Sequence, residues 1–423
     1  MPKRPPSLPG HVLSGQPHHR LWLVQTGLVL LLLMAWLVPV TANAQSRFTS
    51  RQAAAAGAET WSTPLPAPGV EDSRARDTPA AHGWLMLTSD WQHRTRPMSV
   101  HAELNTETIR LAIHRIPLGP AGLWFGARIA GEALFAGLLP DYWIKGEYRA
   151  ENGFYASYVA AEPVLGWDAG RQHFLEFSVT GRRWFFGTSA QTSDTLVLPD
   201  VEWVAEPRFR YTWWGIQEDI SLWQRQRLFR RVRGAAMGVE IGADFRDNTT
   251  PWGALRTNAD VHAAPETPER LNQPGSAILR ARLWAAAGHT FHRRFRLQWR
   301  ADAGVGHRED DLTRQRIGGM NPWVAPISGQ PWASNISGNF ATTRLSAHIR
   351  LRREREVGAT FDIGGVDDAL RTGDSAPAVL WGSSLFADLR GEHWQLDIQI
   401  GFGPSQVDGL LQFSTLLGFG WGF

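Results

Sequence analysis

The sequence predicts an all-β protein, a transmembrane antiparallel β-barrel of about 16 strands, with about 12 to 16 compatible with the pattern. Three observations support this prediction. Apolar and polar residues alternate along many long segments, an export signal precedes them, and the chain ends on an amphipathic strand with a terminal aromatic residue. The 423 residues include 21 Trp, 20 Phe and 42 Gly, a composition that favours many half-buried strands over helices.

The composition also excludes several classes of protein. The chain has no Cys, which removes disulfide scaffolds, Cys-based zinc sites and thiol nucleophiles. Its formal charge of +3 is small for this length and the Arg residues are scattered, so no basic tract indicates nucleic-acid binding. We expect no cofactor, no metal site and no catalytic residues.

Residues 1–44 have the pattern of a signal peptide. Basic residues are followed by an almost uninterrupted apolar run, Leu21–Val40, and the small residues of Ala42–Ala44 form a cleavage site. An uncleaved membrane anchor is the alternative, since such a run is long enough to cross a bilayer. Residues 45–82 show neither helical nor strand periodicity and contain an Ala run and several prolines, which predicts a flexible Ala/Pro-rich linker.

From residue 83 to residue 423 the dominant period is two. In 294–306 the apolar face runs from Phe295 to Val305, and the residues between are Arg, Gln, Asp and Gly. A soluble β-sandwich also alternates, with its apolar face turned inward. The length of these strands, the Trp residues near their ends and the full charges on the polar face instead indicate an outer-membrane barrel with a wet lumen. Because lipid offers no hydrogen bonds, such a sheet has to close on itself.

Sixteen strands can be placed in this region. Their centres lie near residues 88, 112, 126, 157, 176, 185, 211, 240, 258, 283, 300, 346, 361, 384, 397 and 417. Two assignments are ambiguous, because 116–140 also fits one helix or re-entrant segment and 171–189 also fits one long strand.

The last predicted strand has the clearest pattern. Alternate residues from Leu411 to Phe423 are almost all apolar, and Leu416 alone breaks the alternation with its Gln, Ser and Gly neighbours. A chain that ends in this way resembles the C-terminal signal of bacterial outer-membrane barrels. We expect Phe419, Trp421 and Phe423 to form this signal, with outer-membrane lipids and the barrel assembly machinery as partners.

The polar faces of these strands place many charges in the predicted lumen. The cationic set is Arg280, Arg282, Arg296, Arg300, Arg344, Arg350 and Arg352, and the anionic set is Glu240, Asp244, Asp302 and Asp362. One interpretation is a network of Arg–carboxylate pairs that holds a wide barrel in shape. The other is a passage that favours small anionic solutes, since rings of Arg select by charge.

A lipid hydrolase is the alternative from a different class. Barrel hydrolases need a Ser and a His two residues apart on the lipid-facing side of a strand, with a third orienting group. Ser346 and His348 have this spacing, but their face is predicted to be luminal. His289 and His292 fall in a predicted turn, where solvated His residues are common.

Three short motifs resemble the barrel of the outer-membrane assembly-factor superfamily, the BamA and TamA type of bacterial surface antigen. They are Asp247-Asn248 followed by Pro251 and Gly253, then Gly318-Gly319 at the start of the long connection 308–338, and finally Asp362-Ile363-Gly364. The resemblance implies sixteen strands, a Gly-Gly opening to a long sixth external loop, and a lumen-facing D-x-G on the thirteenth strand. It covers the barrel only, and the Arg-Gly pair that docks on the D-x-G aspartate in this family has no clear counterpart in 320–338.

The resemblance implies a role in protein insertion or translocation, or as a membrane-embedded channel, with client proteins as partners. A porin-like passive transporter with an Arg-lined, anion-preferring lumen is the alternative. The connection 308–338 discriminates between them: folded into the lumen it favours the assembly type, and lying outside it favours an open pore.

Overall fold

The structure is a computed structural model of the chain. It describes residues 48–61, 81–93, 98–105, 108–119, 121–132, 143–144, 147–148, 153–188, 192–194, 196–200, 202–216, 233–254, 275–292, 294–310, 312–320, 325, 327–330, 335–352, 355–367, 378–391, 394–404 and 411–422. The predicted signal peptide, 1–44, lies outside the described residues. Within them, no helix is long and apolar enough to cross a membrane.

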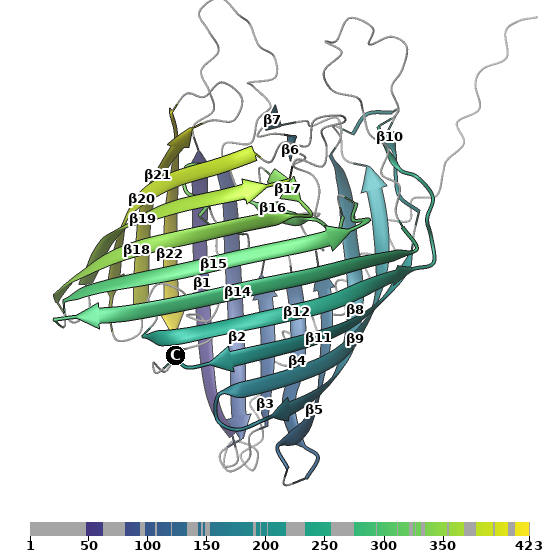
Figure 1. Ribbon diagram of the computed structural model, residues 1–423, viewed down its shortest axis with the longest axis horizontal. Helices are drawn as coiled ribbons and strands as arrows, with labels where there is room; N and C mark the ends of the chain where they lie inside the picture. The colour runs from purple at the N-terminus through teal and green to yellow at the C-terminus, as the bar shows by residue number, and fades with distance from the viewer. Residues whose placement is uncertain are drawn as a thin grey trace, which may run out of the picture.

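Sixteen strands form one closed antiparallel barrel (Figure 1). In barrel order they are β1 (Phe48–Trp61), β2 (Ala81–His93), β3 (Ser99–Asn105), β4 (Thr108–Pro117), β5 (Leu123–Glu132), β8 (Phe154–Asp168), β9 (His173–Thr188), β11 (Trp203–Trp214), β12 (Gly234–Arg246), β14 (Ala277–Phe291), β15 (Phe295–His307), β18 (Phe340–Arg352), β19 (Arg355–Val366), β20 (Ala378–Arg390), β21 (Trp394–Pro404) and β22 (Leu411–Gly422). The predicted all-β, 16-stranded transmembrane barrel is confirmed.

Three two-stranded sheets accompany the barrel. They are β6 (Trp143–Ile144) with β7 (Glu147–Tyr148), β10 (Leu196–Val197) with β13 (Gly253–Ala254), and β16 (Gln315–Ile317) with β17 (Asn335–Ser337). All three belong to connections at the same end of the barrel, at the top of Figure 1.

The barrel closes through its first and last strands. Strand β1 pairs with β22 from Ala53 opposite Gly422 to Trp61 opposite Ser414, and with β2 on its other side. The prediction of a flexible linker over 45–82 is therefore wrong for 48–61, and the barrel begins before residue 83. The Ala run there leaves little contrast between the two faces of the strand, which hides its period of two.

The strand count was right although several individual assignments differ from the structure. Strands β1 and β3 were not predicted, whereas β9 is one continuous strand in place of the two centred near 176 and 185. The strand predicted near 258 falls outside the described residues. The segment 116–140 contains strand β5, and its remaining part after Glu132 is outside the described residues.

The barrel wall turns its apolar side chains outward. Large apolar residues with exposed side chains recur at every second position, among them Phe295, Trp299, Val305, Leu345, Ile349, Leu351, Phe361, Ile363, Leu385, Ile398, Ile400, Phe413 and Leu417. The residues between them are mostly buried polar residues that face the interior. An apolar exterior on a closed sheet is the arrangement that lipid requires, and it places this barrel in the outer membrane.

The last strand follows the same rule. Phe419 and Trp421 lie on the outer face, where they remain 44% and 41% exposed. Leu416, which breaks the alternation in sequence, is buried on the luminal side with 1% exposure. Phe423 lies outside the described residues, so the complete C-terminal signal stays a prediction.

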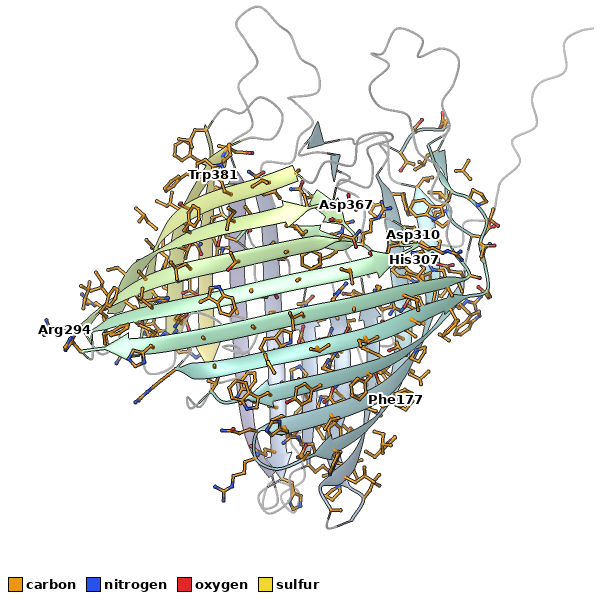
Figure 2. All side chains as sticks on the ribbon, viewed as in Figure 1. Phe177, Arg294, His307, Asp310, Asp367 and Trp381 are labelled. Carbon is orange, nitrogen blue, oxygen red and sulfur yellow. The ribbon has the colours of Figure 1, made fainter. Side chains whose placement is uncertain are left out.

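The two ends of the barrel differ in the length of their connections. Strands β14 and β15, β18 and β19, and β20 and β21 are joined by short turns at one end, whereas β15 and β18 are joined at the other by the connection 308–339. Arg294 and His307 mark these opposite ends of the β15 region (Figure 2). We assign the short turns to the periplasmic side, as in other bacterial barrels.

A charge on the lipid-facing wall should destabilise the protein according to its depth. We expect Leu345→Arg, near the middle of β18, to lower the free energy of unfolding by about 2–4 kcal/mol, and Leu351→Arg, near the end of the same strand, to lower it by about 0–1 kcal/mol. Denaturant unfolding in lipid vesicles measures both values. Equal effects of the two substitutions would contradict the assignment of this face to lipid.

Candidate functional site

A chain of ion pairs crosses the luminal face of six neighbouring strands, from β5 to β14. Its closest N–O contacts are Arg128–Glu162 (3.1 Å), Arg128–Glu176 (3.4 Å), Arg210–Glu176 (3.0 Å), Arg210–Glu240 (2.6 Å), Arg208–Glu240 (3.6 Å), Arg208–Glu206 (2.9 Å), Arg182–Glu206, Arg280–Glu206 (2.6 Å) and Arg280–Asp244 (2.7 Å). Most carboxylates are shared by two or more guanidinium groups. It is a network of Arg–carboxylate pairs, but of the luminal residues named from the sequence only Arg280, Glu240 and Asp244 belong to it.

The predicted luminal arginines fall into separate groups. Arg280 belongs to the network, whereas Arg282, on the same strand, makes no ion pair within 4 Å with any described residue. Arg300 pairs with Asp302 of its own strand at 2.5 Å, and Arg344 pairs with Asp362.

The remaining members of that set lie on β15 and at the end of β18. Arg296 is buried on β15 with 4% exposure. Arg350 lies near the periplasmic end of β18 and is partly buried, and the side chain of Arg352 is outside the described part. The structure therefore does not bring the predicted arginines together in one ring.

The long connection after β15 enters the lumen. Gly318 and Gly319 have φ values of 118° and 82°, which only glycine adopts readily, and they reverse the chain after β16. The Gly318 amide donates to the Ala325 carbonyl at 3.0 Å, and the Ile327 amide donates to the Gly319 carbonyl at 3.1 Å. Ile317 and Ile327 are fully buried against the barrel wall, so this segment fills part of the interior.

The tip of this segment binds the predicted D-x-G aspartate. The Ser328 amide donates to Oδ2 of Asp362 at 2.8 Å, and Arg344 donates to both carboxylate oxygens of Asp362, at 2.5 and 2.7 Å. The Arg344 guanidinium also lies 3.3 Å from the Ser328 hydroxyl. Asp362 is completely buried, so these donors replace the water that its charge would otherwise require.

The loop has no Arg-Gly pair of the kind that the resemblance implies, and the structure shows which groups bind Asp362 instead. The Ser328 amide binds Asp362, so the loop supplies a backbone N–H where the resemblance implies a loop arginine. The guanidinium comes instead from Arg344 on β18, a strand of the wall.

The loop backbone lies against three glycines on the luminal face of the wall, Gly364, Gly382 and Gly401, which we call the glycine track. A side chain on Gly382 of β20 would collide with the Ser328 carbonyl oxygen, and a Cβ on Gly401 of β21 would lie 2.8 Å from the Gly329 amide nitrogen. A Cβ on Gly364, of the D-x-G motif, would lie 3.4 Å from the Ile327 side chain and 2.8 Å from Thr342. The loop can approach this part of the sheet because its luminal face carries no side chains at these positions.

The loop is also bonded to both strands of the closing seam. The Met320 amide donates to Oε1 of Glu59 on β1 at 2.7 Å, and the Gly329 amide donates to the Ser414 hydroxyl on β22 at 3.1 Å. The Gln330 side-chain amide donates to the Pro404 carbonyl, at the end of β21, at 2.6 Å. One segment of the loop therefore joins the lumen, the wall and the seam.

A second cluster anchors the start of the loop at the external mouth, where Figure 2 shows Asp310. Arg246 donates to both oxygens of Asp310, at 2.6 and 3.2 Å, and lies 3.5 Å from Glu202. All three side chains are almost completely buried. Burial raises the pKa of Glu202 to about 7 despite the neighbouring Arg246, and burial raises the pKa of Glu309 to about 7 despite Arg280 and Arg282.

The residues considered for a hydrolase do not face lipid. Ser346 and His348 are buried on the luminal face, with exposures of 5% and 2%, as the alternation predicts. His348 Nδ1 lies 2.7 Å from Glu356, and Phe386 packs edge-on against the imidazole at 4.8 Å. A lipid chain in the membrane does not reach this cluster, although Glu356 provides a third group.

The other His pair lies in a turn, as predicted. His292 follows the last residue of β14 with a φ of 46°, and His289 packs against Phe291. Among the described residues, no group of three or more His, Asp or Glu side chains is arranged to hold a metal ion.

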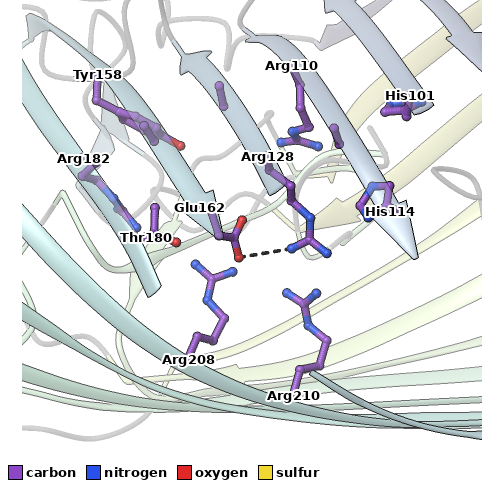
Figure 3. Close-up of a pocket in the computed structure, with 13 residues that line it drawn as sticks. His101, Arg110, His114, Arg128, Tyr158, Glu162, Thr180, Arg182, Arg208 and Arg210 are labelled. Carbon is purple, nitrogen blue, oxygen red and sulfur yellow. Dashed lines mark hydrogen bonds and ion pairs between the residues drawn. The ribbon is translucent and has the colours of Figure 1, made fainter. Parts of the chain in front are cut away.

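The structure also reveals an Arg-lined chamber that the sequence reasoning missed. A cavity of about 340 Å³ opens between β3, β4, β5, β8, β9 and β11 and is lined by His101, Arg110, Ala112, His114, Arg128, Ala130, Tyr158, Ala160, Glu162, Thr180, Arg182, Arg208 and Arg210 (Figure 3). The signal was present in the sequence, since these arginines occupy luminal positions of alternating strands. The luminal charges singled out from the sequence all lie between Glu240 and Asp362, after the strands that form this chamber.

Solved structures with a similar fold are outer-membrane barrels. CdiB from Acinetobacter baumannii matches over 88% of this chain and 60% of its own length, with 12% identity and a TM-score of 0.49. BamA from Haemophilus ducreyi lacking POTRA domains 1–3 matches over 88% and 70%, with 9% identity and a TM-score of 0.52. CdiB from Escherichia coli matches over 88% and 63%, with 11% identity and a TM-score of 0.50.

These similarities concern the fold. No model of a known protein family matches the sequence, and no characterised protein matches it by sequence. This chain spans about 60% of the length of the Acinetobacter CdiB. The predicted likeness to BamA/TamA-type outer-membrane barrels is confirmed at the level of the fold.

A side chain added to the glycine track should displace the loop. We expect Gly382→Ala to increase cleavage of the 308–338 connection by added protease at least roughly tenfold, because loss of even one buried hydrogen bond costs about 1–3 kcal/mol. Gly365→Ala on β19 is the matched control, since a Cβ there meets no atom within 4 Å. Equal cleavage of the two variants would contradict the docking described above.

The external mouth should become less stable as the pH rises through 7. Glu202 and Glu309 have pKa values raised from 4.5 to about 7, so the closed mouth holds protons that the opened mouth releases, and stability falls progressively from about pH 4.5 until both groups are ionised just above pH 7. We expect amide exchange in 309–319 to be slower at pH 6 than at pH 8 after correction for intrinsic exchange rates. The double substitution Glu202→Gln and Glu309→Gln should abolish the difference, and an unchanged difference would refute this origin.

Proposed function

We propose that this chain acts as an outer-membrane barrel for protein insertion or translocation, whose lumen is closed at rest by the docked 308–338 connection. The observation that carries the proposal is the position of the loop tip, where Ser328 and Gly329 bind Asp362 on the wall and Ser414 on β22. The fold shared with BamA and CdiB barrels supports it.

The hydrogen bonds that the loop makes with the wall favour insertion or translocation over the function of a simple pore. A loop that only narrows a pore needs contacts with the wall, whereas this loop also binds Glu59 on β1 and Ser414 on β22. These are the two strands whose pairing closes the barrel. Release of the loop would therefore remove support from the seam in the same step that opens the lumen, which is the coupling that insertion or translocation of a client chain needs.

The alternative is a porin-like passive transporter with an anion-preferring lumen. It requires a continuous water-filled path past the docked loop, and the Arg-lined chamber would then form one part of that path. An outer-membrane lipid hydrolase is the least supported alternative, because Ser346 and His348 are enclosed in the lumen.

Single-channel recording tests the proposal. We expect the purified protein in planar bilayers to give little or flickering current, and Asp362→Asn to give longer and larger openings. This substitution replaces one of the two acceptor oxygens that Ser328 and Arg344 share by an NH2 donor, and it leaves Arg344 buried without a charged partner, an effect of about 3–5 kcal/mol. Asp302→Asn is the matched control, because Asp302 pairs with Arg300 in the lumen. A heat-modifiable shift on gels verifies that each variant is folded.

A second measurement separates the two functions. Vesicles that carry the wild-type protein should accelerate the folding of an added, denatured small outer-membrane barrel relative to empty vesicles, and Asp362→Asn should reduce that acceleration. Stable, large, anion-selective currents from the wild-type protein, without any acceleration of folding, would establish the porin-like alternative instead.

A further inference from the structure

The Arg-lined chamber lies on the opposite part of the wall from the docked loop. The loop binds strands β1, β19, β21 and β22, whereas the chamber is formed by β3, β4, β5, β8, β9 and β11. The two therefore occupy different parts of the lumen, and the chamber remains open while the loop is docked.

Five guanidinium groups converge on this space from four strands. Figure 3 shows the side chains of Arg110, Arg128, Arg182, Arg208 and Arg210 pointing inward around a central gap. Glu162 is the one carboxylate among the described lining residues, and His101, His114, Tyr158 and Thr180 add further polar groups.

Four of these five arginines pair with carboxylates, whereas Arg110 has no such pair among the described residues. Arg128, Arg182, Arg208 and Arg210 all pair within the luminal network. Arg110 makes no hydrogen bond or ion pair with any residue in the described part of the chain.

Two carboxylates act on Arg110 through their charge without hydrogen-bonding to it: Glu103, which lies opposite Arg110 in the pairing of β3 with β4, and Glu132. Glu103 accepts hydrogen bonds from His101 and Asn105, and Glu132 is hydrogen-bonded to Thr108. The network is balanced without Arg110, since its five guanidinium groups, Arg280 included, face five carboxylates: Glu162, Glu176, Glu206, Glu240 and Asp244. Arg110 therefore brings to the chamber N–H groups that no acceptor in the described part of the chain occupies.

We propose that this chamber is a binding site for a phosphate group, either inorganic phosphate or a small phosphomonoester. A phosphate carries about 1.5–2 negative charges at neutral pH and accepts hydrogen bonds from many directions, which suits donors that arrive from several strands. A carboxylate accepts mainly in one plane and carries a single charge. The volume of about 340 Å³ leaves room for a small organic group beside the phosphate.

The site is rigid enough to be selective. The same ion pairs that connect Arg128 to Glu162 and Arg210 to Glu240 fix the directions of their remaining N–H groups. Arg110 is then the residue whose unoccupied N–H groups would donate to the ligand. The proposal does not depend on the proposed function, because binding is measured on the resting barrel.

Isothermal titration calorimetry on the purified, folded protein in detergent micelles tests the site. The probes are inorganic phosphate and glycerol 3-phosphate, with chloride at matched ionic strength as the reference. We expect saturable binding of at least one phosphate probe, at least tenfold weaker in Arg110→Gln and weakened less in Arg110→Lys. Arg300→Gln is the control, since Arg300 is a luminal arginine outside the chamber.

Each outcome of the titration either supports or overturns the proposed phosphate site. Binding of both probes with similar affinity, dependent on Arg110, supports a site that recognises the phosphate group alone, and tighter binding of glycerol 3-phosphate supports a site for a phosphomonoester. The absence of saturable binding up to millimolar probe overturns the proposal, as does equal weakening in Arg110→Gln and Arg300→Gln. Because Arg110 has no ion pair to lose, its substitution should leave the heat-modifiable gel shift unchanged.

Discussion

Closure of the sheet in lipid is the constraint on which the rest of this structure depends. The membrane core offers no partner for a free N–H or C=O group, so β1 has to pair with β22 and the wall has to be apolar outside. The polar residues of the strands are thereby turned inward, where many of them are buried. Burying a charged side chain there raises the free energy of the folded state unless an opposite charge lies beside it. The network from Arg128 to Asp244 supplies these opposite charges.

Pairing alone does not make the lumen uniform. On one side the wall carries glycines, such as Gly382 and Gly401, and the backbone of the loop lies against them. On the other side the wall carries long arginines, whose side chains hold the space open as the chamber. The difference between a filled and an open half of the lumen thus follows from the size of the residues at equivalent luminal positions.

Most of the fold could be predicted because alternation is a local property. It identified the long strands and the outward position of Phe419 and Trp421, but it failed at β1, where Ala occupies both faces, and at β9, where Gly181 and two arginines resemble a turn. The site was harder to predict. Arg344 and Asp362 were both named as luminal, yet their pairing depends on the register of β18 with β19. The docking of Ser328 depends on the path of a loop, about which periodicity contains no information.

The guanidinium that binds Asp362 belongs to Arg344 of the wall, and this lowers the free energy needed to undock the loop. In the assembly-factor barrels that this chain resembles, the loop itself is expected to contribute the arginine, so undocking would separate a buried ion pair at a cost of about 3–5 kcal/mol. Here Arg344 belongs to the wall and stays on Asp362 when the loop leaves. Undocking of Ser328 then breaks backbone hydrogen bonds worth about 0.5–3 kcal/mol each and leaves no charge unpaired. The fixed pair therefore keeps the aspartate in position as an acceptor while making release of the loop easier, which agrees with the reversible closure that we propose.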